Sequence, residues 1–139
     1  MRDRVLHHRK QRPEEWLTFE GNYNLKEAVG KSHNYLLDCI TVLTSNIMFD
    51  ITKDAEKIST EMQIKIEETV VKEISELIAA VKMIKGNLVM VTNEVGDSIV
   101  PGNHVARVYR DIAGRVNQKI AKMCNEVYLV TCGIPLRLK

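Results

Sequence analysis

The sequence lacks a strong charge of either sign, a long hydrophobic run and an evident targeting segment. Lysine and arginine number 20 against 18 acidic residues, and the resulting net charge of +2 does not by itself indicate a nucleic-acid or membrane partner. The apolar runs fall far short of the roughly 20 residues that a membrane-spanning helix needs. The first residues, MRDRVLHHRKQR, contain no apolar core, which argues against a secretory signal. We therefore expect a cytoplasmic protein that binds neither nucleic acid nor a membrane.

Cysteine is also scarce, and Cys39, Cys124 and Cys132 are odd in number. They show neither pairing nor metal-site spacing and lie in apolar segments, so we predict reduced thiols in the core. The chain has no visible repeat or low-complexity tract. Its composition, 45% hydrophobic and 27% charged, is typical of one globular domain, here residues 1–139.

The most informative stretch is LVMVTNEVGDSIVPG, residues 88–102. Its short apolar start, rich in β-branched residues, predicts a core strand. Asn93, Glu94 and Gly96 follow this strand, and Pro101-Gly102 forms a turn. Open α/β sheets bind ligands beyond the carboxyl ends of their strands, so these residues predict a ligand-binding loop.

Apolar periodicity and turn residues predict the other elements. These are a short helix at 3–11, a short strand at 16–20, a short helix at 25–29 capped by Asn24, a buried strand at 35–40, a helix at 41–50, a connection at 51–59, a helix at 60–85 with a capping box at Thr60 and Gln63, a helix at 104–124, a strand at 127–131 and an edge strand at 136–139. Three apolar strands alternating with helices predict a three-layer α/β fold with a mostly parallel sheet.

The triplet Gly30-Lys31-Ser32 imitates the end of a phosphate-binding P-loop. A P-loop needs a glycine five residues before the glycine of this triplet, and Leu25 stands there. A helix is also predicted before the triplet, where a P-loop requires a strand. We therefore reject a P-loop at this position.

On a helix at the N-terminus, Arg4, His8 and Arg12 would form one stripe, whereas His7 aligns with Asp3 and Gln11. Two guanidinium groups would favour a neutral imidazole with a free nitrogen lone pair, and would attract a polyphosphate. The alternative is a solvated basic helix end.

Asp38 lies near the end of the strand predicted at 35–40. It either faces a nucleotide or metal at the sheet's carboxyl edge or caps the following helix, and the residues alone leave both interpretations open. Taken together, the residues indicate a nucleotide or phosphate ligand and a histidine nucleophile.

Several segments match one family in order and spacing. They are RVLHHRKQRP (4–13) with Trp16 and Glu20, LLDCIT (36–41) with Asn46, VTNEVG and IVP within 91–101, ARVYRDIAGRVNQKIA (106–121) and EVYLVTCGIPLRLK (126–139). On these segments the chain resembles the bifunctional adenosylcobinamide kinase / adenosylcobinamide-phosphate guanylyltransferase family of cobalamin biosynthesis. The resemblance covers nearly the whole chain.

The resemblance implies two activities. One phosphorylates adenosylcobinamide with ATP or GTP; the other moves GMP from GTP onto adenosylcobinamide phosphate through a guanylyl-histidine, releasing pyrophosphate. The histidine position corresponds to His8. The resemblance also implies nucleotide contacts by Arg9, Lys10, Gln11, Arg12, Glu20 and Asp38. The two carboxylates would bind Mg²⁺ or accept hydrogen bonds from base or ribose, and no residue is assigned as a resident metal ligand.

The family's fold resembles the P-loop NTPase (RecA-like) class. The resemblance also implies that the protein forms homo-oligomers. Its members begin with a strand and a P-loop, and this chain begins on the order of 40 residues later than such a unit. We therefore expect an N-terminally truncated nucleotide-binding domain, the C-terminal majority of the family domain, that is a poor kinase. The alternative function is a non-catalytic remnant that binds nucleotide or joins an oligomer.

Overall fold

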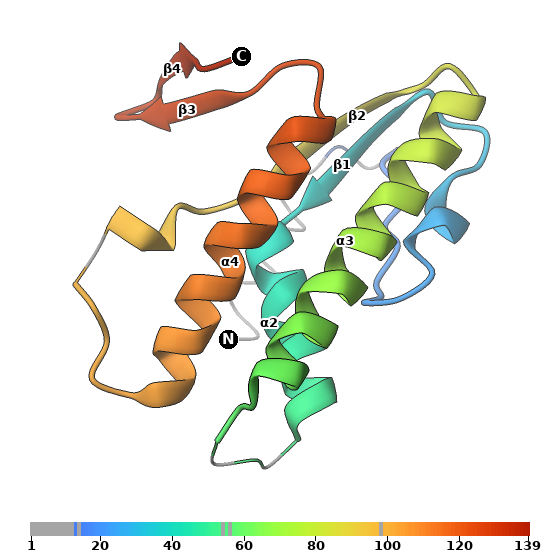
Figure 1. Cartoon of the computed structure of the whole chain (residues 1–139). Helices are drawn as coiled ribbons and strands as arrows, with labels where there is room; N and C mark the ends of the chain where they lie inside the picture. The colour runs from blue at the N-terminus through green and yellow to red at the C-terminus, as the bar shows by residue number, and fades with distance from the viewer. Residues whose placement is uncertain (1–12, 14, 54, 56, 98) are drawn as a thin grey trace.

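The structure, a computed structural model, describes residues 13, 15–53, 55, 57–97 and 99–139 (Figure 1). The elements in chain order are the 3₁₀ helix η1 (Leu25–Ala28), β1 (Asn34–Asp38), α2 (Ile40–Thr52), α3 (Thr60–Met83), β2 (Asn87–Val91), the 3₁₀ helix η2 (Val95–Asp97), α4 (His104–Met123), β3 (Tyr128–Thr131) and β4 (Ile134–Arg137). The helix predicted at 3–11 lies outside the described residues. Among the described helices, none combines the length and apolar character needed to cross a membrane.

The three long helices form where apolar periodicity predicts them. α3 buries residues at steps of three or four along its length, and α4 does the same. The Ser59 hydroxyl accepts a hydrogen bond from the Met62 N–H, so the N-cap of α3 is Ser59 and the capping box predicted at Thr60 is wrong. At the start of α4, the Asn103 side chain accepts from the Ala106 N–H.

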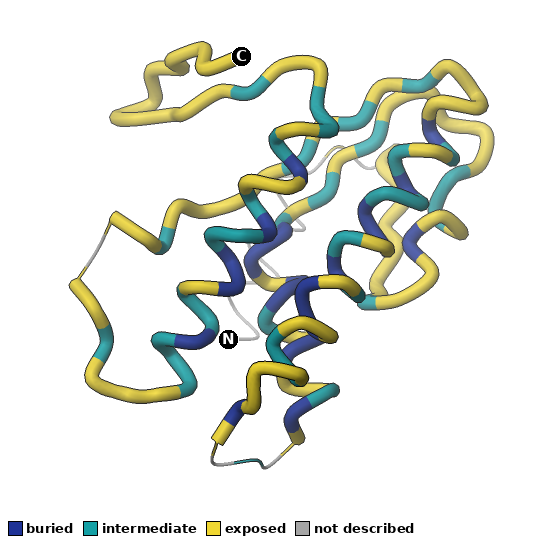
Figure 2. The backbone as a smooth tube through the Cα atoms, viewed as in Figure 1, coloured by how far each residue is buried: buried dark blue, intermediate teal, exposed yellow. Residues whose placement is uncertain are grey.

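The core lies between α2, α3 and α4, whose facing sides are buried (Figure 2). Its largest fully buried side chains include Ile47, Met48, Ile66, Ile74 and Ile112. Burying an aliphatic side chain of this size contributes about 1.5–3 kcal/mol, so the contacts among these helices supply most of the apolar stabilisation.

β1 and β2 pair in parallel, in register from Asn34 opposite Asn87 to Asp38 opposite Val91. The inward residues of both strands are half-buried against the helices, whereas Leu36 and Val89 on the other face are 45% and 61% exposed. The strand predicted at 35–40 forms over Asn34–Asp38, but it is half-buried and not fully buried, because the described residues cover one face of this sheet only. The mixed α/β class with a parallel sheet is confirmed.

The third predicted strand does not join this sheet. β3 pairs antiparallel with β4, from Tyr128 opposite Arg137 to Thr131 opposite Ile134. Between them Cys132 and Gly133 have φ of 53° and 77°. Positive φ at both positions of a two-residue loop gives the tight turn that closes a hairpin. A mostly parallel sheet of three strands is thus wrong in the described residues, which form two separate two-stranded sheets.

Three smaller expectations are corrected. Residues 16–20 form no strand, and Trp16 and Leu17 are 51% and 92% exposed. η1 forms where a short helix is predicted, but Asn24 adopts a left-handed conformation and makes no side-chain cap. The three cysteines are free, but only Cys124 packs against the core; Cys39 is half-buried and Cys132 is exposed.

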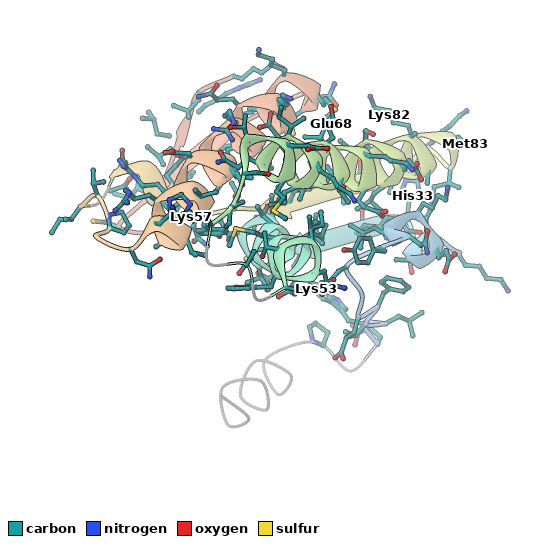
Figure 3. The ribbon with its side chains drawn as sticks, turned by 60° about the horizontal axis from the view of Figure 1, so that its bottom comes forward. His33, Lys53, Lys57, Glu68, Lys82 and Met83 are labelled. Carbon is teal, nitrogen blue, oxygen red and sulfur yellow. The ribbon has the colours of Figure 1, made fainter. Side chains whose placement is uncertain are left out.

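A partly buried ionic cluster links α3 to α4. Glu68, Lys82 and Met83 lie on the outer side of α3 (Figure 3), whereas Glu67 faces α4. Its carboxylate accepts from Arg115 Nε and Lys119 Nζ, each at 2.6 Å, and is 10% exposed. Burial alone would raise the pKa of Glu67, but the hydrogen bonds and charges of the two cations outweigh burial, so the pKa falls below its usual value.

We expect Glu67→Gln to lower the free energy of unfolding at pH 7 by about 1–2 kcal/mol, a value reduced because both cations are nearly half exposed. A carboxylate with a lowered pKa stabilises the fold above the ordinary glutamate pKa, and this contribution disappears as the pH falls through the lowered value. Denaturant melts at pH 7 and pH 3 measure both effects.

Glu76→Gln is the matched control, because Glu76 pairs with Lys26 at the surface and should contribute far less. A Glu67→Gln deficit of equal size at both pH values would contradict the ionic explanation.

Candidate functional site

The parallel register of β1 and β2 brings two carboxyl ends to one edge of the sheet, with Asp38 beside Val91. The chain continues from there into α2 and into the loop at 92–94. The peptide bond between Asp38 and Cys39 is cis. The N-cap of α2 is Cys39, which makes no side-chain cap hydrogen bond. The interpretation of Asp38 as the helix cap is therefore wrong, and Asp38 is the exposed last residue of β1.

Asn117 on α4 holds the loop that follows β2. Its Nδ2 donates to the Asn93 carbonyl at 3.2 Å and to Glu94 Oε1 at 2.9 Å, and its Oδ1 accepts from Thr92 Oγ1 at 2.7 Å. One side chain thus contacts three successive residues of the loop. Since side chain–side chain bonds are a minority of protein hydrogen bonds, their concentration at this edge is unusual.

Thr41, in the first turn of α2, joins the loop to the helices. Its buried hydroxyl accepts from Asn93 Nδ2 at 2.8 Å and lies 3.0 Å from the Cys39 sulfur. Its carbonyl accepts from the Tyr109 hydroxyl at 2.9 Å. Burial raises the pKa of Tyr109, and negative charge at Cys39 would raise it further, so the phenol stays a donor. We call Thr41, Thr92, Asn93, Glu94, Tyr109 and Asn117 the edge network.

The chain after the edge network returns to α4 as a strap, residues 95–97 and 99–102, which two arginines of α4 bind. Arg110 Nη2 donates to the Gly96 carbonyl at 2.7 Å. Arg107 Nη1 donates to the carbonyls of Pro101 and Gly102 at 3.0 and 2.5 Å. Both cations on this part of α4 therefore bind backbone. Arg110 Nε is buried without a hydrogen-bond partner in the part of the chain that the structure describes.

The predicted site residues separate into two groups. His8, Arg9, Lys10, Gln11 and Arg12 lie outside the described residues. Glu20 and Asp38 are described, and both are exposed. The segment that contains Glu20 is held against α2, where Asn46 Nδ2 donates to Asn22 Oδ1 at 2.9 Å.

The rejection of a P-loop agrees with the structure. η1 precedes Gly30-Lys31-Ser32 and β1 follows, whereas a P-loop joins a strand to a helix. Tyr35 fixes this loop, because its hydroxyl donates to the Ser32 carbonyl at 2.7 Å and accepts from the Gly30 N–H at 3.1 Å.

Sequence reasoning missed Thr41, Tyr109 and Asn117 as members of the edge. The available signal was weak: Asn117 is a polar residue directly after the buried Val116, inside a segment that carried the family resemblance. No group of three His, Cys, Asp or Glu side chains within the described ranges could hold a metal ion.

Comparison with known proteins agrees with the resemblance. The model of the family described as cobinamide kinase / cobinamide phosphate guanyltransferase matches residues 1–138. The chain belongs to this family. It is 42% identical to the bifunctional adenosylcobalamin biosynthesis protein CobU of Escherichia coli and 38% identical to that of Salmonella typhimurium, in each case over 100% of this chain and 78% of the relative. A Pseudomonas aeruginosa relative named CobP is 29% identical, over 98% of this chain and 73% of its own length.

Family membership confirms the resemblance stated from the sequence. The relatives are named as bifunctional proteins of adenosylcobalamin biosynthesis, and the family description names a kinase and a guanyltransferase. The chain is therefore a member of an enzyme family, and the fold observed is a mixed α/β arrangement compatible with binding a nucleotide.

The edge network yields a stability test at Thr41. We expect Thr41→Val to destabilise the protein by about 1–2 kcal/mol, because the Asn93 amide loses its acceptor. Hydrogen exchange of the amides in 93–97 should accelerate in the variant.

Thr69→Val is the control, since the Thr69 hydroxyl donates only to the Lys65 carbonyl of its own helix. Unchanged exchange at 93–97 in Thr41→Val would mean that this hydroxyl does not hold the loop.

Proposed function

We propose that the chain transfers GMP from GTP to adenosylcobinamide phosphate in cobalamin biosynthesis. The observation that carries the proposal is the family match over residues 1–138, which includes the segment from His8 to Arg12. The family name alone does not choose between its two activities, and the residues of this chain favour guanylyl transfer.

The proposed reaction has two displacements. A His8 nitrogen attacks the α-phosphorus of GTP, so that a P–N bond forms and pyrophosphate leaves. A phosphate oxygen of adenosylcobinamide phosphate then attacks the same phosphorus, the P–N bond breaks, and adenosylcobinamide-GDP forms. Arg9, Lys10 and Arg12 stabilise the negative charge that develops on the phosphoryl oxygens, and Gln11 contacts the nucleotide.

The two described acidic residues take a different role. Glu20 and Asp38 are exposed carboxylates that would repel a bare triphosphate. They accept hydrogen bonds from base or ribose, or bind Mg²⁺ that arrives with the nucleotide. Since Mg²⁺ is commonly held by one or two carboxylates together with substrate phosphates, a protein-only metal cage is not required.

Phosphorylation of adenosylcobinamide by ATP is less well supported by this chain. Phosphoryl transfer depends on a preorganised cradle for the β- and γ-phosphates. The sequence contains one Gly-Lys-Ser triplet, and its surroundings are wrong for a P-loop. The basic residues from Arg9 to Arg12 supply charge on their side chains, whereas a P-loop cradles the phosphates with backbone N–H groups as well.

A second candidate is a non-catalytic role that binds nucleotide or joins an oligomer. The favouring observation is the β3–β4 ribbon, where Val130, Ile134 and Leu136 are 60–70% exposed. Apolar side chains exposed on a two-stranded ribbon are suited to contact with another chain, including a second copy.

Labelled GTP separates the two candidates. We expect the chain to form an acid-labile GMP adduct that His8→Ala abolishes and His7→Ala largely preserves, because the resemblance implies that His8, and not His7, is the nucleophile. Mass spectrometry of the labelled peptide identifies the site. An adduct that survives in His8→Ala would refute the assignment, and no adduct on the wild-type chain would favour the non-catalytic role.

Asp38 gives an independent test. We expect Asp38→Asn to weaken GTP binding about tenfold, the effect of one lost charge-assisted hydrogen bond, while the melting temperature changes little because Asp38 is exposed. Titration calorimetry and thermal melts measure the two quantities. Destabilisation with intact GTP binding would show instead that Asp38 is structural.

A further inference from the structure

The edge network orders the exposed carboxylate of Glu94. This ordering contributes little to the stability of the fold. Glu94 is exposed, yet Asn117 holds both its Oε1 and the carbonyl of the preceding residue. Fixing a long side chain costs up to about 2 kcal/mol of rotamer entropy, and an exposed hydrogen bond returns little. An ordered carboxylate at the carboxyl edge of a parallel sheet is typical of a ligand contact.

Among the described residues, the charged groups around Glu94 offer a triphosphate little attraction. Arg107 and Arg110, the arginines of α4 nearest the strap, both donate to strap carbonyls. What the loop presents outward is the Glu94 carboxylate, whose Oε2 makes no hydrogen bond within the described residues, together with hydroxyl and amide groups. A carboxylate flanked by neutral groups selects a ligand with N–H donors rather than a polyanion.

The strap adds an apolar surface to this polar edge. Ile99 and Val100 are 91% and 59% exposed, and they lie between residues that Arg110 and Arg107 bind to α4. A large ligand that is apolar over its ring and carries amide groups around its rim would use both surfaces. A corrinoid has this chemistry, because carboxamide side chains surround its macrocycle.

We propose that Glu94, oriented by Asn117, binds a carboxamide N–H of the corrinoid acceptor, with the strap lying against the corrin ring. The identity of the acceptor rests on the proposed function. In this arrangement the basic segment at the N-terminus serves the nucleotide and the edge network serves the acceptor. Asn117 is a positioning residue, since it acts through Glu94.

Acceptor binding can be measured without nucleotide. Equilibrium dialysis of the full chain against adenosylcobinamide phosphate is followed by the visible absorption of the corrinoid. We expect Glu94→Gln to weaken binding about tenfold, because the new amide still accepts from Asn117 but lacks the charge. Asn117→Ala should weaken binding by a similar factor. Gln118→Ala, at an exposed position next to Asn117 on α4, should bind like the wild type.

The Glu94→Gln variant preserves every contact of the edge network. It therefore tests acceptor binding even if Asn117→Ala fails to fold. Wild-type affinity in Glu94→Gln, or a wild-type chain that binds no acceptor, would overturn the inference. Weakened GTP binding with intact acceptor binding would also overturn it and assign the edge to the nucleotide. The GMP adduct on the wild-type chain is a separate readout: acceptor binding without an adduct would refute the proposed transfer and leave the acceptor site standing.

Discussion

The parallel pairing of β1 with β2 is the constraint on which the candidate site depends. Because Asp38 lies opposite Val91, the chain leaves both strands at the same edge of the sheet. A shift of one residue would exchange the inward and outward side chains of a strand, and would remove Leu37 or Met90 from the helices. Packing against the core therefore fixes the register, and the register brings the start of α2 to the loop that contains Asn93.

The helices supply the remaining contacts of the candidate site. α4 contributes Val108, Ile112 and Val116 to the core and Asn117 to the edge network. Burial of this apolar stripe fixes the rotation of α4 about its axis. Asn117, the residue after Val116, therefore faces the loop that follows β2. The ion pairs of Glu67 with Arg115 and Lys119 hold the same helix to α3. The position of the polar edge is thus a consequence of apolar and ionic contacts elsewhere on α4.

The sequence predicts α2, α3, α4, β1 and β2 well, because the helices show an apolar period and the two strands are short apolar runs. The position of β3 was not predictable from its apolar run, since a run of this kind suits a parallel or an antiparallel partner equally. The deciding feature is Cys132-Gly133, a two-residue turn in which a non-glycine residue takes positive φ. Apolar periodicity does not predict such a turn, and cysteine is not among the residues that favour positive φ in a two-residue hairpin loop.

The edge network was predictable only in part. Asn93 and Glu94 are recognisable because they follow an apolar run directly, whereas their partner Asn117 lies 23 or 24 residues further along the chain. Nothing local in a helix shows which polar residue beside the apolar stripe meets a loop and which meets solvent. The residues that contact ligand can therefore be sought at strand ends in the sequence, but the residues that orient them depend on how helices rotate in the folded core.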